Sequence, residues 1–353
     1  MDETDAIFDE ISCTEIQNMM DKMLGNTTFS FSDYVTKLMH GQIPFSLENS
    51  LQTIGNGLAA NLVQERKLYI YLILLAVIGA VLGNFATLLQ GKQVAQTAFY
   101  AVYLLFFSVL ITSFAQVSQI AETTLEQLLE FMKVLLPSYF ATMAFSQGTA
   151  ATGVYYEFAL SMITIVDYVL LKFVFPAIQV YFLLCIANQL SRQDMFSKMA
   201  ELIQDFVKFI VKAMFGIMMG INVVQGLVLP VTSQLQNSVV LKMSGAIPGV
   251  GNTVSSVAST VLCAGTLVKN AVGITGVIAV ALYCGIPLLR LVLHKFFFQM
   301  ANALIQPVSD KRVIESISSV VSSFRLLIYA VFAGCMMFVV SIALMSAMTS
   351  FRQ

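Results

Sequence analysis

Long apolar runs separated by short polar segments make up most of the chain after residue 68. The hydrocarbon core of a bilayer is about 30 Å thick, so a helix of roughly 20 apolar residues can cross it. Several runs reach this length, and none shows the two-residue alternation of a membrane β-barrel strand. The pattern predicts an all-α, polytopic membrane protein. Its definite spans are residues 69–89, 98–120, 156–190, 213–229, 271–293 and 326–348.

One of these runs, residues 156–190, is longer than a bilayer requires. A helix of about 35 residues extends about 52 Å, so the run either projects beyond the membrane or bends near Pro176. The segments that begin at Pro137 and Pro248 are rich in small residues and too polar for an easy span. They are expected to be re-entrant or to cross completely, which gives six to eight transmembrane or re-entrant helices.

The polar segments between the spans have a helical periodicity of their own. Glu122, Glu126 and Glu130 share one helix face, and leucines occupy the opposite one, which predicts an interfacial helix after the second span. Residues 191–212 and 309–323 are amphipathic segments. Residues 232–244 are expected to form a polar link.

Residues 1–67 differ from the rest of the chain. They contain ten acidic and four basic residues, whereas the remainder contains ten acidic and fifteen basic residues. Their short amphipathic segments predict two or three helices that pack on the membrane body or on a partner. Lys and Arg accumulate in the loops on the other side of the membrane, so this head is expected to be extracytoplasmic. No signal peptide is visible, because acidic residues follow Met1 directly.

Two similar units follow one another in the second half of the chain. Asn188 and Asn302 match at an offset of 114 residues, as do Gly220 and Gly334. Each unit has a small-residue segment, a long apolar helix, a basic amphipathic linker and a second span. Both enter the membrane from the same side, which predicts parallel internal repeats. The prolines that define them are Pro137 and Pro176 in the first unit and Pro248 and Pro287 in the second, 39 residues apart in each.

These patterns divide the chain into four regions. The helical head comprises residues 1–67, and two transmembrane helices with the interfacial helix follow in residues 68–134. The first membrane repeat comprises residues 135–245, and the second comprises residues 246–353.

Composition agrees with a membrane protein. Hydrophobic residues make up 58% of the chain and charged residues 11%, with a mean hydropathy of +0.81, whereas a soluble domain carries roughly 25% charged residues. The net charge is −1 and there is no basic patch, so we do not expect nucleic acid as a partner. The five cysteines form no CxxC pair, which argues against a disulfide framework or a zinc site.

Polar side chains at membrane depth are the candidate functional groups. Asp167 lies within an apolar run, and Lys172 follows about 140° further around the helix, so the two are not expected to pair. A central Asp or Lys costs about 2.5–3.5 kcal/mol, so each is expected to face a partner, a neighbouring chain or water. A hydrogen bond between helices, or snorkelling near a helix end, is the alternative for each. Further candidates are Lys269, Asn270, Asn84 and Gln225, and the pairs Gly79–Gly83 and Gly216–Gly220 for close helix packing.

No catalytic or cofactor-binding signature is recognisable. The chain has two histidines, and His294 is expected to face solvent beside Lys295. The glycine-rich segment at residues 245–253 lacks the GK[ST] ending of a phosphate-binding loop. We therefore expect a non-enzymatic protein without cofactor or metal.

Four segments near the C-terminus carry a family resemblance. They are the IPxVG opening at residues 247–251, the LVKNAVGITG block at residues 267–276, the helix around Pro287 and the ALIQPVSD end at residues 303–310. Together they resemble the stage III sporulation protein AE family of endospore-forming bacteria. The similarity extends more loosely back to about Tyr69. It specifies a family but includes no catalytic motif.

The resemblance implies a multi-pass subunit of a channel or transport complex in the mother-cell membrane around the forespore. The implied partners are the sibling stage III A sporulation membrane proteins, a secretion-type ATPase of the same operon, stage II protein Q, further copies of the chain and the lipid bilayer. The family normally begins with a cleaved signal sequence, which would also place the head outside the cytoplasm. Two other functions stay open: a stand-alone secondary transporter, and a scaffold that recruits other subunits.

Overall fold

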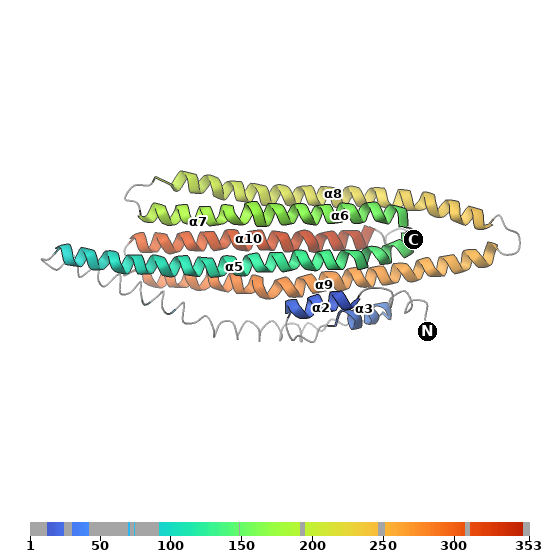
Figure 1. Cartoon of the computed structure of the whole chain (residues 1–353), viewed down its shortest axis with the longest axis horizontal. Helices are drawn as coiled ribbons and strands as arrows, with labels where there is room; N and C mark the ends of the chain where they lie inside the picture. Colours follow the sequence, from blue (N-terminus) through green and yellow to red (C-terminus); the bar gives the residue numbers. More distant parts are fainter. Residues whose placement is uncertain are drawn as a thin grey trace.

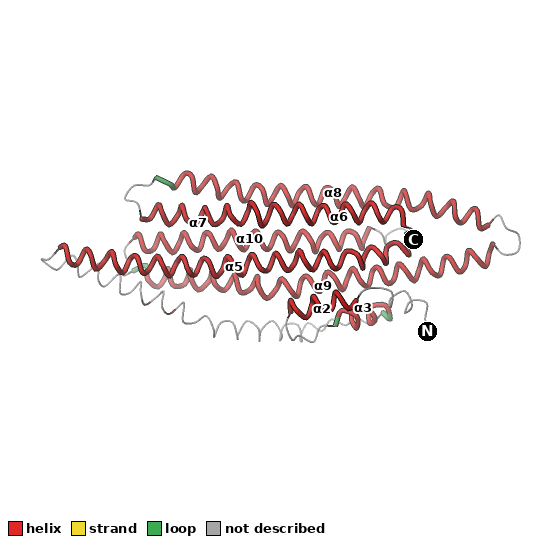
Figure 2. The backbone as a smooth tube through the Cα atoms, in the orientation of Figure 1, coloured by secondary structure: helices red, strands yellow, loops and turns green. Residues whose placement is uncertain are grey.

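The computed structural model describes residues 13–24, 30–41, 92–147, 149–190, 195–245, 251–307 and 311–348, together with residues 70 and 74. Long helices run side by side and form an elongated bundle (Figure 1). The described residues contain helices and no strand (Figure 2). The elements are α2 (Cys13–Leu24), α3 (Phe31–Met39), α5 (Lys92–Gln147), α6 (Thr149–Val169), the π-helical turn η1 (Leu170–Val174), α7 (Phe175–Leu190), α8 (Ser197–Gly245), α9 (Gly251–Ile305) and α10 (Lys311–Met348).

The all-α membrane class is confirmed for this part of the chain. Five helical segments are long and apolar enough to cross a membrane, and they lie in α5, α6–α7, α8, α9 and α10. The predicted span at residues 69–89 lies outside the described residues, apart from Ile70 and Leu74. The number of crossings and the side of the head stay predictions.

Helix α10 is at the centre of the bundle. It packs against α5, α7, α8 and α9. In its membrane-length segment 61% of the most apolar stretch is buried inside the bundle, whereas the share in α8 is 22%. Helix α8 lies along one edge of the bundle (Figure 1). Contact with four helices explains why α10 is apolar around most of its circumference.

An aromatic cluster joins α10 to three of its neighbours. Phe114 of α5 stacks on Phe182 of α7 with the ring centroids 3.9 Å apart, and its ring lies parallel to that of Phe324 of α10 at 6.5 Å. Phe298 of α9 meets Phe324 edge-on at 5.1 Å. All four side chains are buried. Such ring pairs add to the stabilisation that comes from burying apolar area.

Helix α5 is longer than the sequence pattern predicts. It continues through Glu122, Glu126 and Glu130 and past Pro137 to Gln147. The separate interfacial helix and the separate segment after Pro137 were therefore wrong predictions. The helix continues because its other face stays apolar and packed, even where the outer face becomes polar. Pro137 removes one backbone N–H donor, which a packed helix in a bundle can tolerate.

The long apolar run of residues 156–190 contains a π-helical turn. Helix α6 ends at Val169, the turn covers Leu170–Val174, and α7 begins at Phe175. Pro176 follows directly, and it has no N–H to offer the carbonyl of Lys172 four residues earlier. An irregularity was expected near Pro176, and the structure shows it as this wider turn.

Helices α8 and α9 also include segments that the sequence pattern assigned to other elements. The predicted polar link at residues 232–244 lies within α8, which ends at Gly245. The small-residue segment after Pro248 forms the start of α9, which continues through Pro287 to Ile305. In the described residues neither this segment nor the one after Pro137 is a separate re-entrant element.

Two helical hairpins, α7–α8 and α9–α10, turn at matching positions. Ser197 begins α8 and Lys311 begins α10, 114 positions later. Before the first turn, Asn188 Oδ1 accepts a hydrogen bond from the backbone N–H of Phe196 at 3.0 Å. Before the second, Asn302 Nδ2 donates to Ser318 Oγ at 2.9 Å. These turns agree with the sequence offset, while the repeat and the four regions stay predictions.

Gly334 of α10 is closely packed, whereas Gly220, its counterpart in α8, is open. A Cβ atom at Gly334 would lie 2.6 Å from Cδ2 of Leu125 and 3.3 Å from Cδ1 of Leu170, while at Gly220 it would meet no described atom within 4 Å. We expect Gly334→Val to lower the free energy of unfolding by about 1–3 kcal/mol through overpacking. Gly220→Val is the matched control, because the change in helix propensity is the same. Equal thermal unfolding midpoints in one detergent would contradict the close contact.

The N-terminal region contributes α2 and α3, which confirms short amphipathic helices there. Ile16 and Met20 of α2 and Phe31 and Val35 of α3 are buried. Helix α2 packs mainly on α5, and α3 packs on α9. The side-chain oxygen of Gln17 accepts the backbone N–H of Phe31 at 2.7 Å and so joins the two helices. These two helices therefore pack on the bundle.

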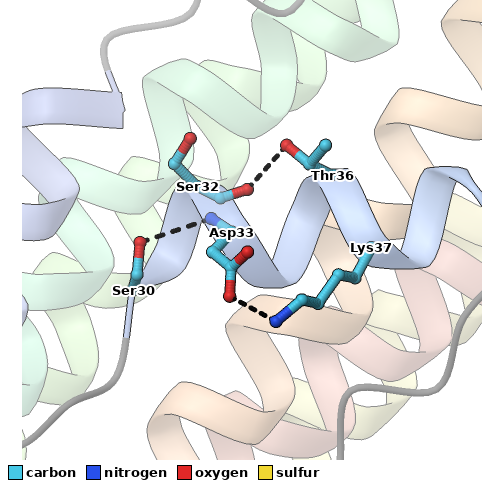
Figure 3. Close-up of polar contacts among 5 residues, drawn as sticks. All are labelled: Ser30, Ser32, Asp33, Thr36 and Lys37. Carbon is cyan, nitrogen blue, oxygen red and sulfur yellow. Dashed lines mark hydrogen bonds and ion pairs between the residues drawn. The ribbon is translucent and has the colours of Figure 1, made fainter.

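Short-range hydrogen bonds close the first turn of α3 (Figure 3). Ser30 Oγ accepts the backbone N–H of Asp33 at 3.3 Å, and Thr36 Oγ1 donates to the carbonyl of Ser32 at 2.9 Å. Lys37 Nζ lies 2.7 Å from Asp33 Oδ2. A serine N-cap satisfies one of the free N–H groups of the first turn. These bonds support a helix of only nine residues, which is too short to be stable by itself in water.

Candidate functional site: the polar face of helix α5

Asp167, the strongest candidate from the sequence, forms an ion pair between α6 and α5. Its Oδ2 atom lies 3.3 Å from Nζ of Lys133, and the two side chains are 32% and 45% exposed. The pair therefore lies on the outside of the single chain. Lys133 follows the three glutamates of α5 and lies well inside this unbroken helix. Lys172 lies in the π-turn and is exposed.

The other polar candidates lie on other helices or outside the described residues. Lys269 is fully buried in α9, and its neighbour Asn270 is half-buried. Gln225 belongs to α8, but its side chain is outside the described part of the structure, and Asn84 lies outside it altogether.

The predicted packing glycines are open where they are described. Gly216 and Gly220 lie on an exposed face of α8, and an added Cβ would meet no described atom within 4 Å. Gly79 and Gly83 lie outside the described residues. Gly216 and Gly220 thus make no close helix contact with the described residues, and close packing at Gly79 and Gly83 stays a prediction.

Asn222 and His294 are polar side chains that are buried inside the bundle. Asn222 Nδ2 donates to Ser341 Oγ at 2.7 Å and links α8 to α10, beside a largely apolar cavity of about 40 Å³. His294 is 2% exposed, so the expectation that it faces solvent was wrong. It lies on the inner face of α9, while the neighbouring Lys295 is only half-buried.

A continuous line of polar residues runs along the outer face of α5. We call it the α5 polar stripe. Its members are spaced by 3, 4, 3, 4 and 3 residues, which keeps them on one side of a helix. All are exposed except the half-buried threonine, whereas Val117, Leu125 and Met132 on the opposite face are buried. The stripe consists of Gln116, Gln119, Thr123, Glu126, Glu130 and Lys133.

The sequence pattern revealed only part of this stripe. Glu126 and Glu130 were assigned to a short interfacial helix. The residues of the stripe before and after this predicted helix were therefore not connected to it. The missed signal was the register, because Gln116, Gln119 and Lys133 fall on the same helical line as the two glutamates.

A groove of about 280 Å³, lined by both polar and apolar side chains, adjoins the stripe between α5 and α9. Gln119 and Thr123 line it from α5, and Tyr283 and Arg290 line it from α9. The hydroxyl of Tyr283 donates to Oε1 of Gln127 at 2.5 Å, and Nε2 of Gln119 donates to Oγ1 of Thr123 at 3.2 Å. We call this hollow the α5–α9 groove.

The groove offers amide, hydroxyl and guanidinium groups, which bind water and polar solutes. Pro287 also lines it and has no N–H to donate to the carbonyl of Tyr283 four residues earlier. No group of three or more His, Cys, Asp or Glu side chains that could hold a metal ion occurs among the described residues. The groove therefore offers polar groups to water beside the apolar side chains of Ile120 and Ile286.

Comparison with known proteins gives one consistent result. The family model for stage III sporulation protein AE matches residues 29–349, which include all five membrane-length helices. Stage III sporulation protein AE of Bacillus subtilis (strain 168) is 24% identical over 298 residues, which cover 84% of this chain and 74% of that protein. No solved structure matches the chain. The chain belongs to the stage III sporulation protein AE family.

Proposed function

We propose that the protein is a non-enzymatic, membrane-spanning subunit of the stage III sporulation channel or transport complex. The observation that carries the proposal is the family match over residues 29–349. That match covers five helices able to cross a membrane. The exposed polar face of α5 suits a passage or assembly role.

The proposed location is the mother-cell membrane around the forespore, with the head extracytoplasmic. The proposed partners are the sibling stage III A membrane proteins, the secretion-type ATPase of the same operon and stage II protein Q. These partners follow from the family, and the charge distribution of the chain supports the orientation of the head.

The exposed charges of α5 support assembly with other chains. Glu126, Glu130 and Lys133 lie on the outer face of a membrane-length helix. Three such charges facing lipid near the bilayer centre would together cost about 8–10 kcal/mol, as much as the whole stability of many proteins. At membrane depth this face must therefore meet water or another protein. A homo-oligomer or a joint assembly with sibling subunits satisfies that requirement.

A genetic and biochemical experiment tests the proposal. In a spore-forming host that lacks its own family member, we expect few heat-resistant spores. The tagged full-length chain should restore spore formation, and sibling stage III A subunits should co-purify with it in mild detergent. A tagged unrelated polytopic membrane protein is the control for co-purification.

Two outcomes would contradict the proposal. The first is normal spore formation in the host without any family member. The second is saturable solute uptake by the purified chain alone in liposomes, which would favour a stand-alone secondary transporter. A restored spore count with no pathway for solutes in the purified complex would instead favour the scaffold function.

A further inference from the structure

The α5 polar stripe has nearly the length of a membrane crossing. From Gln116 to Lys133 an α-helix rises about 26 Å, and the hydrocarbon core of a bilayer is about 30 Å thick. The opposite face of the helix is mostly apolar and buried, and α5 packs on α6, α9 and α10. A helix with one polar line of this length and packed apolar faces has the pattern expected of the wall of an aqueous pathway.

The α5–α9 groove widens this polar line. Gln119 and Thr123 belong to both the stripe and the groove, and Arg290 adds a cation from α9. The groove volume is about 280 Å³, and one water takes about 30 Å³ in the liquid. Several waters or one small hydrated solute can therefore occupy it.

Carboxylates outnumber cations along this surface. Glu126 and Glu130 of the stripe are exposed, and neither takes part in the ion pair of Lys133, whose partner is Asp167. Together with Asp167 they make three carboxylates, against the two cations Lys133 and Arg290. In a closed ring of copies the same carboxylates would recur in every subunit, and rings of Asp or Glu select cations.

We propose that α5 lines a water-filled pathway, with the α5 polar stripe facing the lumen and the α5–α9 groove forming a hollow in its wall. The pathway admits cations and uncharged hydrophilic solutes in preference to anions. The open side of the stripe is closed by further subunits. This inference rests on the proposed function, because it assigns the lining of a passage that the complex must contain.

Ion selectivity provides the first test. The tagged full-length chain, with the subunits that co-purify, is reconstituted in planar bilayers under a potassium chloride gradient. We expect a reversal potential that shows potassium preferred over chloride. Replacing both carboxylates (E126Q and E130Q) should lower the permeability ratio by a factor of about three or more, because a charged lining raises the local concentration of counter-ions. The matched control is Glu201→Gln, which removes an exposed carboxylate on α8.

Covalent block of a folded protein provides the second test and avoids the risk that a variant fails to fold. The five native cysteines are replaced, and one cysteine is introduced at Glu130 or, as a control, at Leu202, which is 68% exposed on α8. A positively charged, water-soluble thiol reagent should reduce conductance at least about twofold in the Glu130→Cys complex, since it places a cation in a cation-selective lining. It should leave the Leu202→Cys complex unchanged.

The outcomes separate the inference from the proposed function. If the reconstituted complex conducts, but neither E126Q/E130Q nor reagent at Glu130→Cys changes conductance or selectivity, the stripe does not face the lumen and the inference is overturned alone. If the purified complex does not conduct at all, the proposed transport function fails and the inference fails with it. If the unmodified complex preferred chloride over potassium, the proposed preference for cations would be wrong.

Discussion

Replacing Phe324 by alanine should lower the free energy of unfolding by about 3–5 kcal/mol, the usual range for removing a buried phenylalanine. Phe324 is fully buried in the central helix, and its ring contacts those of Phe114 and Phe298. The change would leave a cavity where α5, α9 and α10 meet. Thermal or denaturant unfolding of the purified variant in detergent measures the loss.

Phe332→Ala is the matched control for this substitution. Phe332 lies two turns further along the same helix and is 47% exposed. Substitutions of exposed residues usually change stability by about 0.5 kcal/mol or less. A loss at Phe332 as large as that at Phe324 would contradict the central position of the aromatic cluster.

Replacing Lys269 by glutamate should be nearly as damaging, with a loss of about 3–5 kcal/mol for a fully buried charge deprived of its partners. Lys269 is 0% exposed. An ammonium group only donates hydrogen bonds and a carboxylate only accepts them. Glutamate would therefore reverse both the charge and the hydrogen-bonding role of this buried side chain. Unfolding in detergent and the yield of folded protein would measure the effect.

Two further substitutions locate the cause of this loss. Lys172→Glu makes the same change in an exposed residue of the π-turn, and it should cost far less. Lys269→Met keeps much of the side-chain length and removes the charge, so it should be tolerated better than glutamate. If the Lys269→Glu and Lys172→Glu variants were equally stable, that result would contradict the buried position of Lys269.

The membrane class and the approximate position of each long helix could be predicted from the sequence. An apolar run of more than 20 residues predicts a membrane helix, because only helices and closed barrels satisfy the hydrogen bonds of all backbone groups in lipid. Element ends were harder to predict. Glu122 was taken as the start of a new element, but Leu125 and Leu128 continue the buried face of α5 without interruption.

The partner of Asp167 could not be found from local spacing. Lys133 lies 34 residues earlier, and the two meet because α5 and α6 fold back on each other near residue 148. Residues at similar distances from such a turn lie side by side in an antiparallel pair. Knowing that α5 continues through Pro137 would have identified Lys133, and the supposed break at that proline concealed it.

The solvent-facing prediction for His294 failed for a related reason. Its neighbour Lys295 indicated a membrane edge, where long cationic side chains reach water. On a helix, however, adjacent residues point in different directions. His294 therefore lies on the buried side of α9, while Lys295 reaches further out.

The π-turn at Leu170–Val174 determines which side of α7 faces the bundle. Val166 and Ile186 are both buried, yet an uninterrupted α-helix would place them about 160° apart around its axis. One extra residue in a wide turn rotates the following helix by about 100° relative to an ideal one, which brings the two residues about 100° apart. The turn thereby accommodates one extra residue and keeps one apolar run facing the bundle over its whole length. Straightening it into an α-helix without losing a residue would rotate the inner face of α7 by about 100° away from α10, whereas a chain one residue shorter between Leu170 and Val174 could keep that face inward in a regular helix.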